Sequence, residues 1–395
     1  MQKLHLSHRH TLGSVGSFSI YLAVLFLSFH YFFIVYINSN FLSTFINEKF
    51  VGYFYIGGSI LGIMFLLSSY RILRKIGNYR FALIATIVEI LTLVVLSQAQ
   101  NIWVAGIAFM IQHATNPIIL YSLDIFLESV TNKEDAGKSR GLFLTILNTP
   151  PIVATLVTGI ILRENDFSQV YMIAIAFLIP LLMIIMSNFK KFRDEKYIKI
   201  EVKDVLNRFK SERLIRDIFI DNVLLQVFYA VMTIYLPVYL LNNIGFSLAE
   251  ISFIFSVMLV PFVLLQFPVG RIADEKLGEK ELLILGFVIM TFSMLMISFI
   301  KLPTLILWAM VLILTRIGAA IVEIMTETYF FKHVGKRDAH VMSIFRMSHG
   351  IAFALMPLIG GLLLLFVSIQ YIFAIFAFII LFFGLRYAFD LVDTK

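Results

Sequence analysis

Long apolar stretches without formal charges constrain the fold of this chain more than any other feature. A helix rises 1.5 Å per residue, so about 20 apolar residues are needed to cross the hydrocarbon core of a bilayer. Stretches free of Lys, Arg, Asp and Glu lie at residues 10–47, 51–70, 141–162, 167–189, 222–249, 251–270 and 282–300. Further spans are expected at 81–99, 101–126 and 302–330, which hold a few charged residues, and at 347–385, which is long enough for two. We therefore predict an all-α membrane protein with twelve transmembrane helices.

The composition agrees with lipid as the main solvent. Apolar residues make up 60% of the 395 residues and charged residues 14%, whereas a soluble protein carries about 25% charged residues. The chain has no cysteine, which excludes disulfides and thiolate metal sites. It also contains no Gly-rich phosphate loop, no His-Glu-x-x-His zinc motif and no Gly-x-Ser-x-Gly turn. We therefore predict that the chain is not an enzyme and uses neither a cofactor nor a metal.

The distribution of basic residues predicts the topology. Of the 32 Lys and Arg residues, 28 fall in one set of alternate connections, 3 fall in the other, and Arg316 lies inside a span. Because cytoplasmic loops are enriched in Lys and Arg, both termini are expected in the cytoplasm of a multi-pass protein of the cell membrane. The net charge of +7 is then a result of topology, and we expect no binding to nucleic acid. The first apolar stretch is too long for a signal peptide, so we expect a retained helix.

A basic connection divides the predicted spans into six and six. Ten of the Lys and Arg residues lie in residues 190–216. We therefore predict an N-terminal six-helix half at 1–189, a cytoplasmic linker at 190–216 and a C-terminal six-helix half at 217–395.

The two halves resemble each other weakly. At a shift of 203 residues, His113 aligns with Arg316 and Asp124 aligns with Glu327, while residues 133–136 match 336–339. Two six-helix halves that hold a substrate near the membrane midplane are a common plan among transporters.

Residues 267–280, with the sequence Phe-Pro-Val-Gly-Arg-Ile-Ala-Asp-Glu-Lys-Leu-Gly-Glu-Lys, carry a recognisable pattern. It resembles the signature that the major facilitator superfamily has between its second and third helices and, more loosely, between its eighth and ninth. The resemblance implies two pseudo-symmetric six-helix bundles, a secondary transporter and a monomer. The first half departs from the pattern, because Ser69 and Leu73 replace its first Gly and its Asp. The signatures of drug antiporters in the fourth and fifth helices are missing, which weakens an efflux function.

Arg316 is the strongest candidate for a substrate-binding residue. A charge at the middle of a bilayer costs about 2.5 to 3.5 kcal/mol on insertion scales, so Arg316 needs a reason to be there. Glu323 and Glu327 follow at i+7 and i+11, on the same helical face. Arg316 either binds an anionic substrate group or holds Glu323 ionised, or it forms a permanent ion pair that only fixes packing.

The fourth predicted span offers a second set of polar residues. His113 and Asn116 share a broad face beside Pro117, which lacks an N–H and favours a kink. An imidazole titrates near neutral pH, so His113 is a candidate proton carrier, although a structural hydrogen bond is equally consistent with its position. Glu89 lies deep in the third span and needs a partner or a proton. The remaining cavity candidates are the polar residues Gln112, His30, Asn148, Gln226 and Tyr229.

The resemblance also implies a cytoplasmic gate. Asp274 would meet the helix start near Arg140, where the helix dipole favours an anion, and Arg271 would pair with Glu327. Such contacts would close the cytoplasmic side in one state of the transporter and break in the other. The predicted gate consists of Gly270, Arg271, Asp274, Gly278, Glu327, Asp124, Arg140 and Arg346.

The function expected from the sequence is secondary active transport of a small solute by alternating access, coupled to a proton. The solute is either an amphipathic compound that is exported or a small organic anion or metabolite, and the direction stays open. The alternative is a membrane sensor on a transporter fold that no longer transports. The expected partners are the solute, H+ and the lipid bilayer.

Overall fold

The computed structural model describes residues 16–131, 136–161, 166–194, 211–273, 278–333 and 339–392, which form helices and short connections. Asp274 and most of the 190–216 linker therefore lie outside the described residues, as does the side chain of Arg271. Helices are the expected result, because a chain in lipid has no water to satisfy its backbone N–H and C=O groups.

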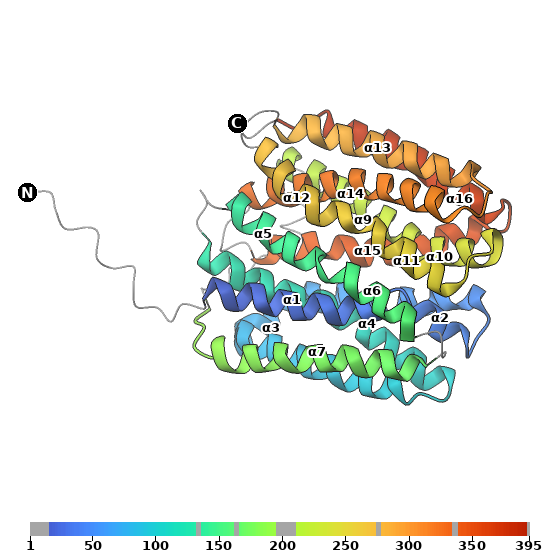
Figure 1. The fold of residues 1–395 in the computed structure, drawn as a ribbon. Helices are drawn as coiled ribbons and strands as arrows, with labels where there is room; N and C mark the ends of the chain where they lie inside the picture. Colours follow the sequence, from blue (N-terminus) through green and yellow to red (C-terminus); the bar gives the residue numbers. More distant parts are fainter. Residues whose placement is uncertain are drawn as a thin grey trace, which may run out of the picture.

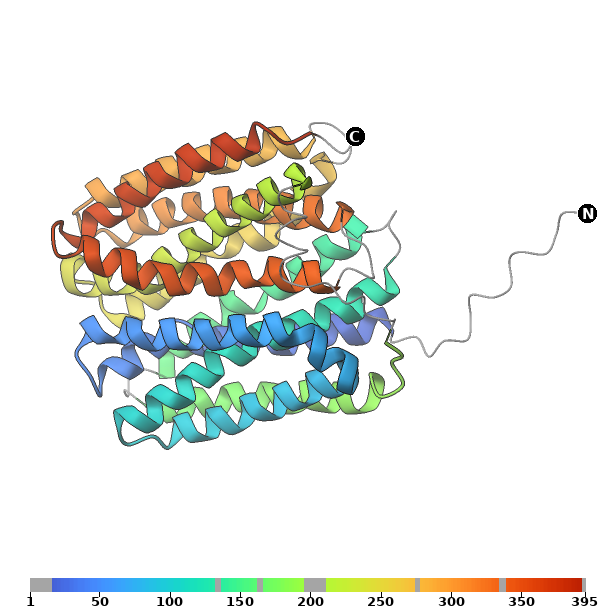
Figure 2. The same cartoon turned by 180° about the vertical axis from the view of Figure 1, so that it is seen from behind.

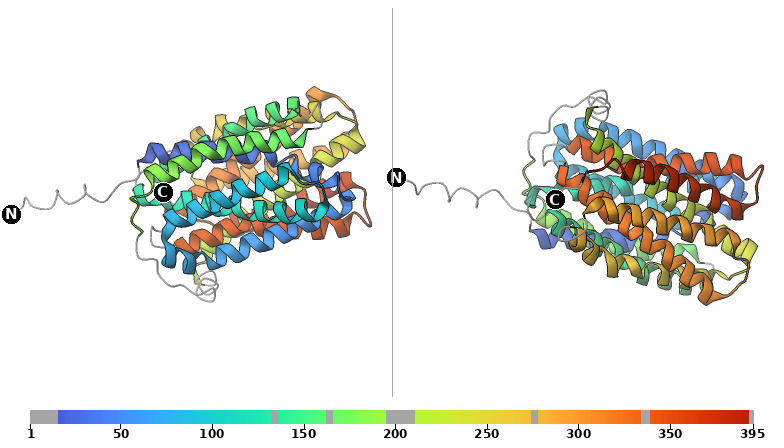
Figure 3. Two further views of the ribbon diagram at one scale, coloured as in Figure 1. Left: turned by 90° about the horizontal axis from the view of Figure 1, so that it is seen from below. Right: turned by 90° about the horizontal axis from the view of Figure 1, so that it is seen from above.

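The helices form two groups that lie side by side along one common direction (Figures 1 and 3). The first group contains α1 (Ser17–Ile34), α2 (Asn38–Ser43), α3 (Glu48–Ser97), α4 (Ile102–Val130), α5 (Ala136–Asn148), α6 (Pro150–Ile161) and α7 (Phe167–Asn188). The second group contains α9 (Arg213–Ile234), α10 (Leu236–Tyr239), η3 (Leu240–Ile244), α11 (Leu248–Met258), α12 (Val260–Ile272), α13 (Glu279–Phe299), α14 (Leu305–His333), α15 (Ala339–Leu363) and α16 (Ile369–Ala388).

Among the described residues, eleven helical segments are long and apolar enough to cross a membrane, so the chain is a multi-pass membrane protein. The sequence predicted twelve. The difference arises at α3, where residues 50–97 form one continuous segment that contains two of the predicted spans. Gly77 interrupts this helix with φ of 77° and ψ of 161°, a conformation that favours glycine. The two arms of α3 run in opposite directions from this bend (Figure 2).

Two ends of the bundle can be told apart. We call the end where α1 begins and α16 ends the terminus end, and the opposite end, where α2 and α10 lie, the far end (Figure 1). Two membrane-spanning segments are each broken into two helices, and proline follows both breaks. Pro150 and Pro151 follow the break between α5 and α6, and Pro261 follows the break between α11 and α12. Proline lacks an N–H for the helical ladder, so a helix readily ends before it.

Glycines allow α3 of the first group to pack closely against α15 of the second. A Cβ atom on Gly52 would lie 2.9 Å from the Cβ of Pro357, and one on Gly350 would lie 2.9 Å from Ile63. Both distances are too short for real Cβ contacts, so only glycine fits at this spacing. Small residues commonly bring membrane helices together in this way, because van der Waals packing replaces the hydrophobic driving force.

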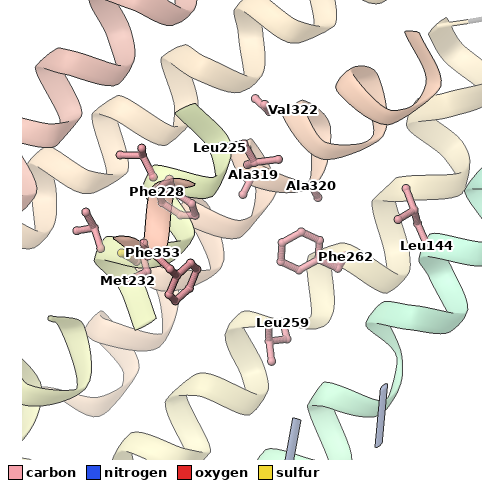
Figure 4. Close-up of a cluster of buried hydrophobic side chains, with 14 of the residues drawn as sticks. Leu144, Leu225, Phe228, Met232, Leu259, Phe262, Ala319, Ala320, Val322 and Phe353 are labelled. Atoms are coloured by element: carbon pink, nitrogen blue, oxygen red, sulfur yellow. The ribbon is translucent and has the colours of Figure 1, made fainter. Parts of the chain in front are cut away.

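Apolar side chains fill the second group and form one wall toward the first. Figure 4 shows Leu225 and Phe228 of α9 near Ala319 of α14, with Met232, Leu259 and Phe262 in the same cluster, while Leu144 of α5 lies apart from them. All of these residues except Leu144 belong to the second group, and the cluster is fully or nearly fully buried. Packing of this kind positions the polar residues of α9 and α14 that are described next.

Candidate functional site

A cavity of about 190 Å³ lies between the two groups of helices. Most of its wall is apolar. Polar side chains enter it mainly from α9, α14 and α15 of the second group. The lining residues are Leu27, Ser28, Tyr31, Phe32, Val35, Tyr36, Asn116, Pro117, Leu120, Leu144, Leu147, Asn148, Asn222, Gln226, Tyr229, Thr233, Leu259, Phe262, Arg316, Glu323, Glu327, Arg346, Ser348, His349 and Phe353.

Arg316 enters this cavity from α14 and is 2% exposed. Its guanidinium carbon lies 5.2 Å from the ring centroid of Phe228 and 5.7 Å from that of Tyr229, so aromatic faces hold the cation. Among the described residues, Arg316 forms no ion pair and its Nε has no hydrogen-bond partner. The permanent ion pair that the sequence left open is therefore not formed with Glu323 or with any other described residue. The structure instead presents a buried cation without a counter-charge in direct contact.

Glu323 lies two turns further along α14 and joins three helices. Its Oε2 accepts hydrogen bonds from Gln266 of α12 at 2.6 Å and from Asn148 of α5 at 3.2 Å. Asn148 belongs to the first group, so this carboxylate links the two groups at the cavity wall. Sequence reasoning found Asn148 and Glu323 but missed Gln266, which is a single polar residue within an apolar stretch.

Asn116 and Gln226 also line the cavity, as predicted. Asn116 Oδ1 is buried and has no hydrogen-bond partner among the described residues. Gln226 Oε1 lies 3.3 Å from His349 Nδ1. An unsatisfied amide oxygen in a cavity wall is available to a donor group of a ligand.

Four charged residues meet on the terminus-end side of the cavity, and we call them the ionic cluster. They are Asp124 of α4, Arg140 of α5, Glu327 of α14 and Arg346 of α15. Arg140 donates to Asp124 at 2.8 Å and to Glu327 Oε2 at 2.7 Å and 2.9 Å. Arg346 donates to Asp124 Oδ2 at 2.6 Å and Oδ1 at 3.2 Å, and to Glu327 Oε1 at 2.6 Å and Oε2 at 3.1 Å.

The ionic cluster is buried and balanced in charge. Asp124, Arg140 and Glu327 are at most 4% exposed, and two guanidinium groups face two carboxylates. Each carboxylate accepts from both arginines, which gives the charge-assisted geometry that stabilises buried ions. Two members come from each group of helices, so the cluster fastens the groups together at the terminus end.

The other predicted gate residues are Arg271, Asp274, Gly278 and Gly270. The predicted contacts of Arg271 with Glu327 and of Asp274 with Arg140 lie outside the described side chains, and Glu327 pairs with Arg140 and Arg346. Gly278, at the start of α13, has a φ of 88°, a conformation that glycine adopts readily. A Cβ atom on Gly270 would lie 3.6 Å from Ile324, an ordinary contact distance.

The far-end side of the cavity is closed by apolar contacts. The rings of Tyr36 and Phe255 lie 5.2 Å apart, across the two groups. A second cavity of about 30 Å³ lies next to them, and Phe32 and Tyr36 line both cavities. We call Phe32, Tyr36 and Phe255 the aromatic closure. Beside it α6 packs on α11, where Ser256 Oγ donates to the carbonyl of Ile152.

Two of the predicted cavity residues, His30 and Gln112, lie elsewhere, inside the first group, and both contact Glu89. Glu89 Oε1 lies 2.8 Å from His30 Nε2 and accepts from Gln112 at 3.0 Å, and Thr115 donates to Oε2. His30 and Glu89 are fully buried, and none of these residues lines the cavity. The predicted cavity candidates His30 and Gln112 therefore do not line this cavity, and Glu89 has the kind of buried partner that its depth in the third span was expected to require. Hydropathy places a residue within a span but does not tell which helix its side chain meets.

His113 is also outside the cavity. Its Nε2 lies 3.2 Å from Ser59 Oγ, and its ring lies 5.8 Å from that of His349. Gly58 makes room for it, since a Cβ there would lie 2.9 Å from the Cβ of His113. His349 lines the cavity and belongs to α15, so the two imidazoles lie on either side of the contact between the groups.

Comparison with known proteins agrees with this architecture. The sequence model of the Major Facilitator Superfamily matches residues 218–394. The multidrug efflux pump SdrM of Staphylococcus aureus (strain N315) is 27% identical over 188 residues, which are 47% of this chain and only 38% of that protein's length. The crystal structure of the human organic anion transporter MFSD10 (TETRAN) has a TM-score of 0.75 and 11% identity, over 94% of this chain and 98% of that one. At this identity the likeness shows the fold alone. The sequence match thus assigns residues 218–394 to the major facilitator superfamily, and the structural match extends the same fold to nearly the whole chain.

Proposed function

We propose that this protein is a secondary transporter that carries a small organic anion with an apolar body through the central cavity by alternating access. One observation carries the proposal. Arg316 is buried in the cavity wall without an acidic partner among the described residues, and most of the surrounding wall is apolar.

A buried, unpaired guanidinium is costly, and a bound carboxylate removes that cost. Arg316 rests on Phe228 and Tyr229, and its Nε has no partner. A guanidinium presents a planar fork of N–H donors that fits a carboxylate through two parallel hydrogen bonds. The apolar wall, including Phe262 and Phe353, suits an aromatic or branched body attached to that carboxylate.

The names of the similar proteins support both properties of this substrate. SdrM is described as a multidrug efflux pump and MFSD10 as an organic anion transporter. An amphipathic anion is consistent with both descriptions, and the direction of transport stays open.

Charge balance in the cavity supports coupling to one proton. Arg316 and an ionised Glu323 give the empty cavity no net charge. A bound anion would add one negative charge at a site with little water, which is unfavourable in a low dielectric. A proton on Glu323 restores neutrality, so the anion and the proton are expected to move together.

The two closures then act as the gates on either side of the cavity. The strong excess of Lys and Arg on one side supports a cytoplasmic terminus end in the plasma membrane, with the ionic cluster as the inner gate and the aromatic closure as the outer gate. The six-helix halves at 1–189 and 217–395 rock about the cavity, joined by the basic linker at 190–216.

Thermal unfolding of the purified protein tests the substrate class. The probes are aryl and branched alkyl monocarboxylates, each compared with its uncharged amide. A carboxylate at 100 times its Kd should stabilise the protein by about 2.7 kcal/mol and raise the midpoint, while the matched amide should not. Equal stabilisation by acid and amide would contradict the role of Arg316.

Counterflow in proteoliposomes then tests transport itself. A carboxylate that binds should also exchange across the membrane against its labelled form. Binding without exchange would favour a sensor that keeps the transporter fold.

A further inference from the structure

The pair formed by His30 and Glu89 has no part in the mechanism above, although both side chains are completely buried. Three groups from two helices converge on the Glu89 carboxylate: His30 Nε2 of α1, and Gln112 Nε2 and Thr115 Oγ1 of α4. No Lys or Arg forms an ion pair with Glu89 within the described part of the chain. Its counter-charge, if it has one, must therefore be a protonated His30.

The possible charge states of this pair favour one bound proton. With one proton the pair is neutral overall, either as imidazolium with carboxylate or as imidazole with carboxylic acid. Without that proton, one negative charge would stay buried among apolar helices, which is expensive unless water or a cation reaches it. The pair is therefore a site that binds a single proton. With that proton bound it is neutral and is stable in surroundings without water.

The surrounding helices supply few other titratable groups. Gln112 and Thr115 of α4 do not titrate. Tyr171 of α7 is separated from Glu89 by two residues, because its hydroxyl donates to Asn38 Oδ1 at 3.0 Å and Asn38 Nδ2 donates to Gln112 Oε1 at 3.5 Å. Among the described side chains in direct contact with Glu89, His30 alone can share its proton.

The same network flanks a break in the first membrane segment. α1 ends at Ile34 and α2 begins at Asn38, with a turn at residues 35–37 between them. His30 lies before the break, and Asn38 lies after it and reaches Glu89 through Gln112. Tyr36 lies within the break and contacts Phe255 in the aromatic closure. The network thus holds both flanks of the turn that positions Tyr36.

We propose that His30 and Glu89 form a proton-binding site, separate from the transport cavity, that controls the aromatic closure at the far end. With the proton bound, the network is neutral and holds the turn at 35–37 in place, so the closure stays shut. When the proton leaves, the buried charge draws water to the network, the turn shifts and the closure opens. The proposal rests on the proposed function, because it assigns the regulation of one of its gates.

The chain contains no cysteine, so a single introduced cysteine can report on the far end. Asn40→Cys places the thiol in the small cavity beside Tyr36 and Phe255. Ser43→Cys lies at the exposed end of the same helix, and its labelling rate is the reference that corrects for the pH dependence of thiol reactivity. The measurement is the rate of labelling by a polar maleimide in nanodiscs between pH 6 and pH 8.5, without any substrate.

We expect the corrected labelling rate of Asn40→Cys to rise with pH by up to about tenfold per unit, the limit for release of one proton. Glu89→Gln should abolish this rise. Thr115→Val removes a hydrogen bond from the same carboxylate but leaves both titratable groups, so the rise should persist. Thermal unfolding of each variant checks that it is folded, and His30→Gln provides a second variant that should abolish the rise if Glu89→Gln fails to fold.

Three results would overturn the proposal. They are a rate independent of pH in the parent, a rise that persists in folded Glu89→Gln, and a rise lost equally in Thr115→Val. Arg316→Gln separates this test from the proposed function, because it should reduce stabilisation by carboxylates and leave the labelling rise intact. If the parent protein shows the labelling rise but no stabilisation by carboxylates, the proposed substrate is refuted, and if it shows stabilisation but no rise, the proton site is refuted.

Discussion

The two ends of the central cavity are closed by different chemistry. At the terminus end, Asp124, Arg140, Glu327 and Arg346 form a buried cluster with seven hydrogen bonds between opposite charges. At the far end, the closure consists of aromatic contacts such as that between Tyr36 and Phe255. Both join the same two groups of helices.

This difference determines how each end responds to change. Buried charges stabilise a contact only while all partners are present, since removing one leaves an uncompensated charge. Aromatic contacts are less directional, and losing one removes a small amount of dispersion and buried area. The ionic cluster should therefore behave as an all-or-none lock, whereas the aromatic closure can be adjusted in small steps by the helix break that carries Tyr36.

Arg140→Gln should have the largest effect on this comparison. It leaves Arg346 alone against two buried carboxylates, which should weaken closure of the terminus end by about 3 to 5 kcal/mol. Maleimide labelling of Leu144→Cys, which lines the cavity one turn beyond Arg140, should become much faster. Labelling of Asn40→Cys at the far end should not rise with it.

The matched control restores the charge balance of the ionic cluster. Arg140→Gln combined with Glu327→Gln leaves one arginine and one carboxylate, so labelling of Leu144→Cys should return toward the parent rate. Similar labelling in the parent and in folded Arg140→Gln would contradict the description of the cluster as a lock.

Arg316→Gln should have the next largest effect, a loss of carboxylate affinity in the cavity that lies between the two closures. A hydrogen bond to a charged group contributes about 1.5 to 3 kcal/mol, which corresponds to roughly 10- to 150-fold in Kd. Carboxylate binding, measured by titration calorimetry, should weaken by that factor. The Kd of Arg316→Lys should lie between those of the parent and Arg316→Gln. Unchanged binding in Arg316→Gln would exclude this side chain from the site.

Glu323→Gln should change the pH dependence of binding rather than binding itself. In the parent, carboxylate affinity should fall as pH rises, by up to about tenfold per unit, because an ionised Glu323 leaves the loaded cavity negative. The amide mimics the protonated form, so affinity in Glu323→Gln should be high and independent of pH. A slope that persists in this variant and disappears in Glu89→Gln would move the coupling proton to the pair in the first group.

The sequence predicted the terminus end better than the far end. Asp124 and Glu327 were found because the two halves repeat at a shift of 203 residues, and a charge inside an apolar stretch is conspicuous. Tyr36 and Phe255 give no such signal, since they are two aromatic residues among 40 Phe and 16 Tyr. Apolar contacts between distant helices depend on packing that hydropathy does not report.

The same limit explains the misplaced cavity residues. Helical spacing correctly put Arg316, Glu323 and Glu327 on one face of α14, because that inference needs only one helix. Placing His30 and Gln112 beside Glu89 requires knowing that α1 and the second arm of α3 both meet α4 on a side away from the cavity. The merging of two spans at Gly77 was not predictable from the lengths of the apolar stretches.

Phe255→Leu should have the smallest effect, a modest opening of the far end. It keeps an apolar side chain but removes the ring contact with Tyr36, which is worth about 0.5 to 1.5 kcal/mol. Labelling of Asn40→Cys should rise by roughly 2- to 12-fold, since about 1.4 kcal/mol is tenfold in an equilibrium. Phe253→Leu is the matched control, because Phe253 lies on the same helix but is 45% exposed, and its labelling should equal that of the parent. If Phe255→Leu opened the far end as strongly as Arg140→Gln opens the terminus end, the far end would also be a lock, and the aromatic ring would be its essential part.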